Sequence, residues 1–463
     1  MKDVLGTHKA VEYLAVVVSG LPNHEEGEVI EVVEIESSTG AAQAEAVWSV
    51  LKKCGAVDNV RGLLFDTTAS NTGCHSGAAV RLLKSFEKPK LYFECRHHVP
   101  ELIIKAVWNE LFGEDPSGEI KDFATFKDMW PYIDKSNPKK LNILPGFEED
   151  LKAENVSFLN DLLSNPGKKG LPRDDYLEAA RLTLFLLGGD VPGMEKMVFW
   201  APGATHKARF MAKMIYGLKM FAFSDLNLDH DLLAAEKPRV DDLQLGEGYL
   251  DQLERFVRFV CLLYSAYWFK APVGVEAPMN DLDFYHKLLK YRLIDEGVAD
   301  AALSVLNRHL FYLTQELTVF TLFSNKVHED EKSELAAKLI SSKKPETWEL
   351  KKPATPLLTP DTKLKDLIGP KSWLLFKVLD VNVDWLLLDP KEWKKYPAYQ
   401  EAEQFVRSCK VVNDGSERGV KLIQDYCDKL TKSSEKRKFL LKAVQASRAE
   451  VKDMSKASLN KLS

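Results

Sequence analysis

The segment VRGLLFDTTASNTGCHSGAAVRLLKSFEKPKLYFECRHH, residues 60–98, decides the predicted fold. Its first apolar run stops at Asp66, and small, hydroxyl and amide residues then predict a loop. The apolar spacing of 76–88 predicts a helix, and 90–95 is a second apolar run that predicts a strand. A strand, a helix and a strand in this order predict two parallel neighbours joined by a crossover helix.

The residues before this segment predict two more strands and a helix. The near-continuous apolar run 11–20 and the alternating run 28–37 each predict a strand, and GLPNHEEG at 20–27 favours a hairpin between them. The alanine-rich stretch 39–55 ends in Gly55 and predicts a helix. The expected order is therefore β-β-α-β-α-β, and the expected fold class is α/β.

Beyond His98 the pattern changes to helical periodicity almost without strands. We expect three parts: 1–98 with the strands, 99–400 as an all-helical block, and 401–463 as three C-terminal helices. The proline- and lysine-rich stretch 342–360 predicts an exposed crossing loop within the helical block.

Composition excludes few classes of protein. The 463 residues carry a net charge of −5, but 401–463 has a balance of +5. Such a basic segment suits a phosphate-backbone partner and equally a solvated helical surface. The six cysteines form no CxxC pair and no secretory signal is evident, which favours reduced thiols in the cytoplasm or nucleus. The most apolar run, 256–272, contains two basic residues and predicts a buried helix instead of a membrane span.

Asp66 is the first candidate for chemistry. A carboxylate at the end of a strand, beside an open loop, is a common way to hold a divalent cation. The alternative is structural, since Asp66 could form an Asx-turn with Thr68 or cap the next helix.

Two further clusters contain residues of catalytic type. ECRHHVPEL at 94–102 brings Cys95 and His98 to the end of the next strand. A zinc site is conceivable, although paired CxxC spacing is absent. Its candidate ligands are Cys74, His75, Cys95, His97 and His98.

The segment VVNDGSERGV at 411–420 places Glu417 in the first turn of a helix, with Arg418 beside it and Lys421 one turn later. A surface Glu–Lys pair is the plain interpretation of this spacing. A group of basic residues also follows the Pro-Gly turn at 202–203. These residues could contact phosphate groups, or they could form a solvated helix face. Its members are His206, Lys207, Arg209 and Lys213.

FDTTASNTG, CRHH and VVNDGSERGV together resemble hAT-type DDE transposases, and more narrowly a transposon-derived group of invertebrate genomes. The resemblance covers nearly the whole chain, including PGATHKARFMAKMIY at 202–216. It implies an RNase H-like mixed sheet interrupted by a large all-α insertion, with the catalytic acids at one end of the sheet.

The resemblance also implies the roles of the candidate residues. Asp66 and Glu417 would be the second and third acids of the triad and would bind Mg²⁺ or Mn²⁺, while Cys95, His98 and Asn71 would support the site. Two metal ions would promote phosphodiester hydrolysis at transposon ends and then strand transfer, without a covalent protein intermediate. DNA would be the partner, with a homodimer or higher oligomer as the acting form and the nucleus as the location.

One departure from the family concerns the first acid. The family's first strand runs between the hairpin and the Asp66 strand, whereas the strand predicted at 11–20 matches the second strand. Asp3 lies too near the start to end a central strand. We therefore expect the first catalytic strand to be missing, Met1 to be an internal methionine of a longer ancestral frame, and catalysis to be impaired.

Three functions follow as hypotheses. The first is a transposase core for DNA transposition, and the second is a catalytically inactive, domesticated or remnant transposase that binds DNA or protein. The third is another RNase H-like nuclease. No membrane partner is expected.

Overall fold

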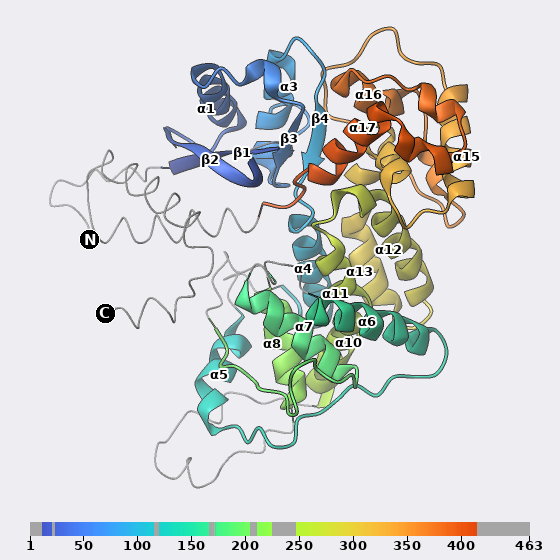
Figure 1. The fold of residues 1–463 in the computed structure, drawn as a ribbon. Coiled ribbons are helices and arrows are strands. Elements are labelled where there is room, and N and C mark those ends of the chain that lie inside the picture. The colour runs from blue at the N-terminus through green and yellow to red at the C-terminus, as the bar shows by residue number, and fades with distance from the viewer. Residues whose placement is uncertain are drawn as a thin grey trace, which may run out of the picture.

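The computed structural model of the chain describes residues 12–20, 24–114, 120–165, 171, 173–203, 211–224 and 247–413. Within these ranges the protein is mixed α/β and mostly helical. Figure 1 shows the strands at one end of the molecule beside α15–α17, and the helices α5–α8 and α10 at the opposite end.

The predicted order of the N-terminal elements is confirmed. Strands β1 (Glu12–Gly20) and β2 (His24–Ile35) precede helix α1 (Gly40–Lys53), which is followed by β3 (Gly62–Phe65). Then come the one-turn helix α2 (Ala69–Thr72), which the sequence did not predict, α3 (Ala78–Ser85) and β4 (Leu91–Glu94). Thr39 caps α1 as its side chain accepts a hydrogen bond from the Ala42 amide.

The strands form two separate sheets within the described residues, where we expected one mixed sheet. β1 pairs with β2 as an antiparallel hairpin, and β3 pairs with β4 in parallel, so the predicted crossover is confirmed. No described strand joins the hairpin to the parallel pair. Leu63, Leu91 and Phe93 of the parallel pair belong to the hydrophobic core, together with residues of α3 and α4.

All regular elements described beyond His98 are helical, as predicted. Helix α4 (His98–Phe112) runs from the end of β4 into the helical block (Figure 1). The α-helices that follow are α5 (Lys121–Met129), α6 (Phe147–Ser164), α7 (Asp174–Leu186), α8 (Ala212–Ala222), α10 (Glu247–Phe259), α11 (Ser265–Lys270), α12 (Ala277–Tyr291), α13 (Glu296–Leu306), α14 (Gln315–Thr318), α15 (Glu329–Ser341), α16 (Leu374–Leu379) and α17 (Pro397–Ser408).

The apolar run 256–272 is a buried helix, as predicted, but it contains an irregular turn. Residues Val260–Tyr264 are π-helical and join α10 to α11. Asn155 of α6 donates hydrogen bonds to the carbonyls of Cys261 (3.3 Å) and Leu262 (2.6 Å) in this turn. Among the described helices, none is both long and apolar enough to cross a membrane.

The joint at 342–360 has no helix or strand, as predicted, but several of its residues are half-buried where we expected an exposed loop. The half-buried Lys352 reaches the end of β4, where its ammonium lies 2.9 Å from Glu94. The joint therefore connects the helical block to the parallel strand pair.

Candidate functional site

Asp66 follows β3 directly and is half-buried. Its Oδ1 accepts hydrogen bonds from the Thr68 amide (2.9 Å), the Thr68 hydroxyl (2.6 Å) and Nδ2 of Asn71 (2.7 Å). The bond to the Thr68 amide is the Asx-turn that we considered as the structural alternative. All three donors meet Oδ1 and none meets Oδ2, so the turn orients the carboxylate and leaves its second oxygen for another contact.

The parallel pairing brings the predicted site residues to one edge of the sheet. Phe65 is the register partner of Glu94, and the Cys95 amide donates to the Phe65 carbonyl at 2.7 Å. Asp66 and Cys95 therefore leave their strands side by side. This neighbourhood follows from the parallel topology that the sequence predicted.

His98 is the first residue of α4 and lies in the electrostatic field of Asp66. Burial lowers the pKa of the His98 imidazole. The negative charges of Asp66 and Glu94 oppose this shift, and His309 adds to it. Burial is the largest of these effects, so it favours the neutral form of the His98 imidazole.

Cys95 is fully buried and contacts the chain that leaves α17. Its Sγ accepts a hydrogen bond from the Asn413 amide at 3.4 Å, and the Arg96 amide donates to the Val411 carbonyl at 2.8 Å. The segment 411–413, more than 300 residues from Cys95 in the sequence, thus passes along the same edge as Asp66.

Several predicted site residues lie outside the described residues. These are Glu417, Arg418, Lys421, His206, Lys207 and Arg209.

Lys213 is the one predicted DNA contact that the structure describes, and it lies in the first turn of α8, half-buried. It faces Glu101 in the first turn of α4 closely enough for their charges to interact. Burial raises the pKa of Glu101 to about 8, and the positive charge of Lys213 opposes this shift. Lys213 therefore has a carboxyl neighbour, which the interpretation as a solvated basic face did not foresee.

A second polar cluster, which the sequence did not reveal, surrounds Glu94 at the end of β4. The Glu94 side chain is only 1% exposed. Its Oε1 accepts a hydrogen bond from the Tyr92 hydroxyl (2.6 Å) and forms an ion pair with Nζ of Lys352 (2.9 Å). Its Oε2 lies 3.8 Å from Nδ1 of His309. The strand-end rule that selected Asp66 would also have selected Glu94, whereas no local signal marked Lys352 or His309.

Arg96 and His97 anchor the strand end to the helical block. Arg96 forms an ion pair with Asp281 of α12, and both side chains are almost completely buried. The His97 ring stacks on Trp268 at 4.3 Å between centroids. His97 therefore has a packing role, which leaves it poorly placed for the zinc site that we considered.

The remaining zinc candidates do not come together either. Cys74 is exposed and Cys95 is buried. Over the described part of the chain, no three His, Cys, Asp or Glu side chains are arranged to hold a metal ion.

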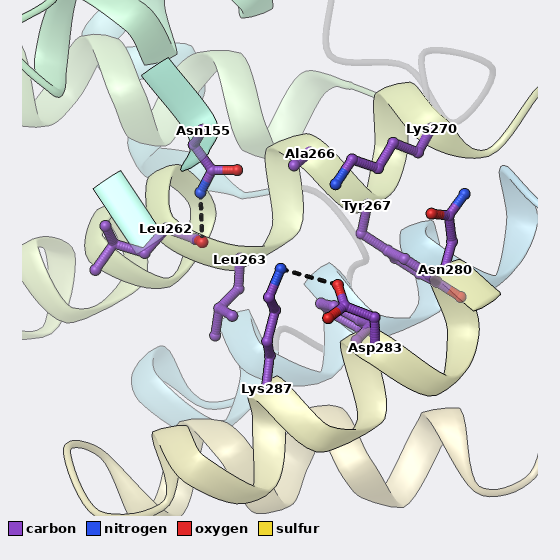
Figure 2. A pocket seen from close by; sticks show the side chains of 10 residues that line it. Asn155, Leu262, Leu263, Ala266, Tyr267, Lys270, Asn280, Asp283 and Lys287 are labelled. Carbon is purple, nitrogen blue, oxygen red and sulfur yellow. Dashed lines mark hydrogen bonds and ion pairs between the residues drawn. The ribbon is translucent and has the colours of Figure 1, made fainter. Parts of the chain in front are cut away.

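One small pocket lies in the helical block. Figure 2 shows it between the π-helical turn, α11 and α12, with Lys287 paired to Asp283. Its space of about 20 Å³ has room for roughly one water molecule. Tyr267 in its wall donates a hydrogen bond to Asp281 (3.1 Å), so the pocket adjoins the buried ion pair. It is too small to be a substrate site.

Comparisons with protein-family models, curated proteins and solved structures give no significant match for this chain.

Proposed function

We propose that the chain is a transposase-like DNA-processing protein of the hAT type, in which Asp66 and Glu417 bind Mg²⁺ or Mn²⁺ at the end of the β3–β4 pair. The observation that supports this most directly is the contact between Cys95 and Asn413. It brings the chain that leads to Glu417 to the edge where Asp66 emerges from β3.

The length of chain after Asn413 suits this proposal. Glu417 is four residues further on, and four residues of chain span at most about 14 Å. A large helical insertion between the strand end and this acid is what the resemblance implies, and the regular elements described between residues 99 and 408 are all helices. The final acid therefore has a short path back to Asp66.

The two sheets also suit an RNase H-like core. That fold has a first strand between the hairpin and the Asp66 strand. On the two sides of that strand the fold has an antiparallel hairpin and a parallel pair, which is the pairing among the described strands. The described strand pairings are therefore compatible with the proposed core.

The residues around Asp66 fit a hard divalent cation. Carboxylate oxygens are the ligands that Mg²⁺ and Mn²⁺ prefer, and Oδ2 of Asp66 is not used by the Asx-turn. Thr68 and Asn71 fix the carboxylate, and His98 would support the site from the first turn of α4. The bound ions would supply activation of the attacking hydroxyl and stabilisation of the leaving oxygen.

A second candidate function is a transposase-derived protein that binds DNA or protein without catalysis. The observation that favours it is the Asx-turn, which gives Asp66 a structural role that needs no metal ion. Under this proposal the fold and the basic residues still bind DNA or protein, and Asp66 and Glu417 no longer catalyse a reaction. DNA, a homodimeric or higher assembly and a nuclear location are proposed for both candidates.

Nicking of supercoiled DNA by the purified chain, with Mn²⁺, separates the two candidates. Asp66→Asn and Glu417→Gln test the acids, and Glu87→Gln is the matched control because Glu87 is exposed on the same part of the chain. Under the first candidate we expect nicking that both site substitutions abolish and that Glu87→Gln leaves unchanged. Circular dichroism checks that each variant is folded.

DNA binding in the same preparation tests the alternative. A folded chain that does not nick but binds DNA, with an affinity that falls steeply with salt, supports the non-catalytic candidate. Nicking that survives Asp66→Asn would overturn the proposed site.

A further inference from the structure

We propose that Lys352 is a positioning residue for the Asp66 carboxylate, through which the helical block acts on the candidate site. Only the test by Mn²⁺ binding rests on the proposed function. Lys352 comes from the joint between α15 and α16, some 280 residues after α2 in the sequence. It makes the contact by which this joint holds both β4 and α2.

The first step is the fixed position of the ammonium group. Nζ of Lys352 lies 2.9 Å from Oε1 of Glu94, 4.4 Å from the ring centre of Phe311 and 5.5 Å from that of Tyr92. The Lys352 side chain is 17% exposed and that of Glu94 is 1% exposed. A cation enclosed by a carboxylate and two aromatic faces has little freedom to move.

The second step is its bond to α2. Nζ of Lys352 also donates to the Thr72 carbonyl at 3.0 Å. Thr72 is the last residue of α2, and the final carbonyls of a helix lack partners within the helix. A helix of one turn is unstable on its own, so an external donor at its end contributes strongly to its order.

The third step leads from α2 to Asp66. The Thr72 amide (2.8 Å) and hydroxyl (3.1 Å) both donate to the Thr68 carbonyl. Thr68 and Asn71 in turn supply all three hydrogen bonds to Oδ1 of Asp66. Lys352 therefore holds the turn whose side chains orient the carboxylate, without touching Asp66.

The experiment must separate this role from ordinary stabilisation. Lys352→Met alone leaves the buried Glu94 carboxylate without its cation, which destabilises the whole chain. Glu94→Gln/Lys352→Met removes both charges, so it restores much of the global stability while the bond to Thr72 stays lost. Lys351→Met is the matched control, because the neighbouring Lys351 is 57% exposed and pairs with Glu349 at the surface.

Amide hydrogen exchange of Asn71, Thr72 and Gly73 gives a readout independent of metal and activity. We expect exchange about tenfold faster in the double variant than in the unchanged chain, with no change in Lys351→Met and none in α12. Unchanged exchange at these three amides in the double variant would overturn the proposal.

Mn²⁺ titration of the same proteins tests positioning of the carboxylate. We expect about tenfold weaker binding in the double variant, the scale typical of residues that orient metal ligands. Equal Mn²⁺ affinity in the double variant would overturn the positioning role. If the unchanged chain binds no Mn²⁺, the proposed function fails, and hydrogen exchange alone then decides whether Lys352 holds the Asp66 turn.

Discussion

Glu101 is a carboxyl whose protonation should be visible in the pH dependence of stability. Burial raises its pKa from 4.5 to about 8, so between these values the folded chain binds more protons than the unfolded chain. Stability therefore falls as pH rises through this window, by at most about 1.4 kcal/mol per pH unit from this group. Urea unfolding of Glu101→Gln between pH 5 and pH 8 should show a shallower decline.

Two companion variants test this assignment. Glu110→Gln changes an exposed carboxyl on the same helix and should keep the slope of the unchanged chain. Lys213→Met removes the charge that opposes the shift and should extend the decline to higher pH. Identical slopes for Glu101→Gln and the unchanged chain would show that Glu101 ionises normally.

Single residues also show what the sequence could predict about the site. Asp66 and Asn71 contact each other because they belong to one short loop, and such local chemistry is visible in the sequence. Lys352 meets Glu94 across 258 positions, and nothing in either neighbourhood marks that meeting. Residues far apart in the chain are brought together by packing, which a local pattern does not record.

The packing of α1 against α2 and α3 depends on Gly40. A Cβ at this position would lie 2.4 Å from the Ser76 carbonyl oxygen and 2.7 Å from that of Ser70. Both obstacles are backbone atoms that cannot rotate away, so Gly40→Ala must push α1 from the Asp66 loop. We expect a loss of about 1–3 kcal/mol in the free energy of unfolding, measured in urea.

Gly248→Ala provides the matched control, because Gly248 is also helical and a Cβ there meets nothing within 4 Å. We expect this change to stabilise the chain by about 0.4–1 kcal/mol through helix propensity. A similar small gain from Gly40→Ala would mean that α1 is not held against the neighbouring backbone.

The elements themselves were largely predictable from periodicity, and their irregularities were not. The order of strands and helices up to β4 and the parallel pairing of β3 with β4 agree with prediction. The one-turn α2 and the π-helical turn at Val260–Tyr264 do not appear in the pattern, because one turn is too short to show a period and a π turn inserts a residue into it.

Over the whole molecule, the residues 94–98 join the strands to the helical block. Glu94 meets the joint after α15, Cys95 meets the segment after α17, Arg96 meets α12 and His97 stacks on α11. The sequence drew attention to this segment for its catalytic residue types. Its anchoring role became apparent only with the positions of the distant partners.

The ion pair between Arg96 and Asp281 ties these two regions across 185 positions, and breaking it should weaken the whole chain. Asp281→Asn leaves a buried guanidinium without its counter-ion and should cost about 3–5 kcal/mol in the free energy of unfolding. Arg96→Met/Asp281→Asn removes both charges and should recover a large part of that loss.

Lys53→Met, which breaks the exposed pair with Glu31, should cost less than about 1 kcal/mol. Urea midpoints followed by tryptophan fluorescence compare these variants, and equal midpoints for Asp281→Asn and Lys53→Met would contradict a tie through buried charge.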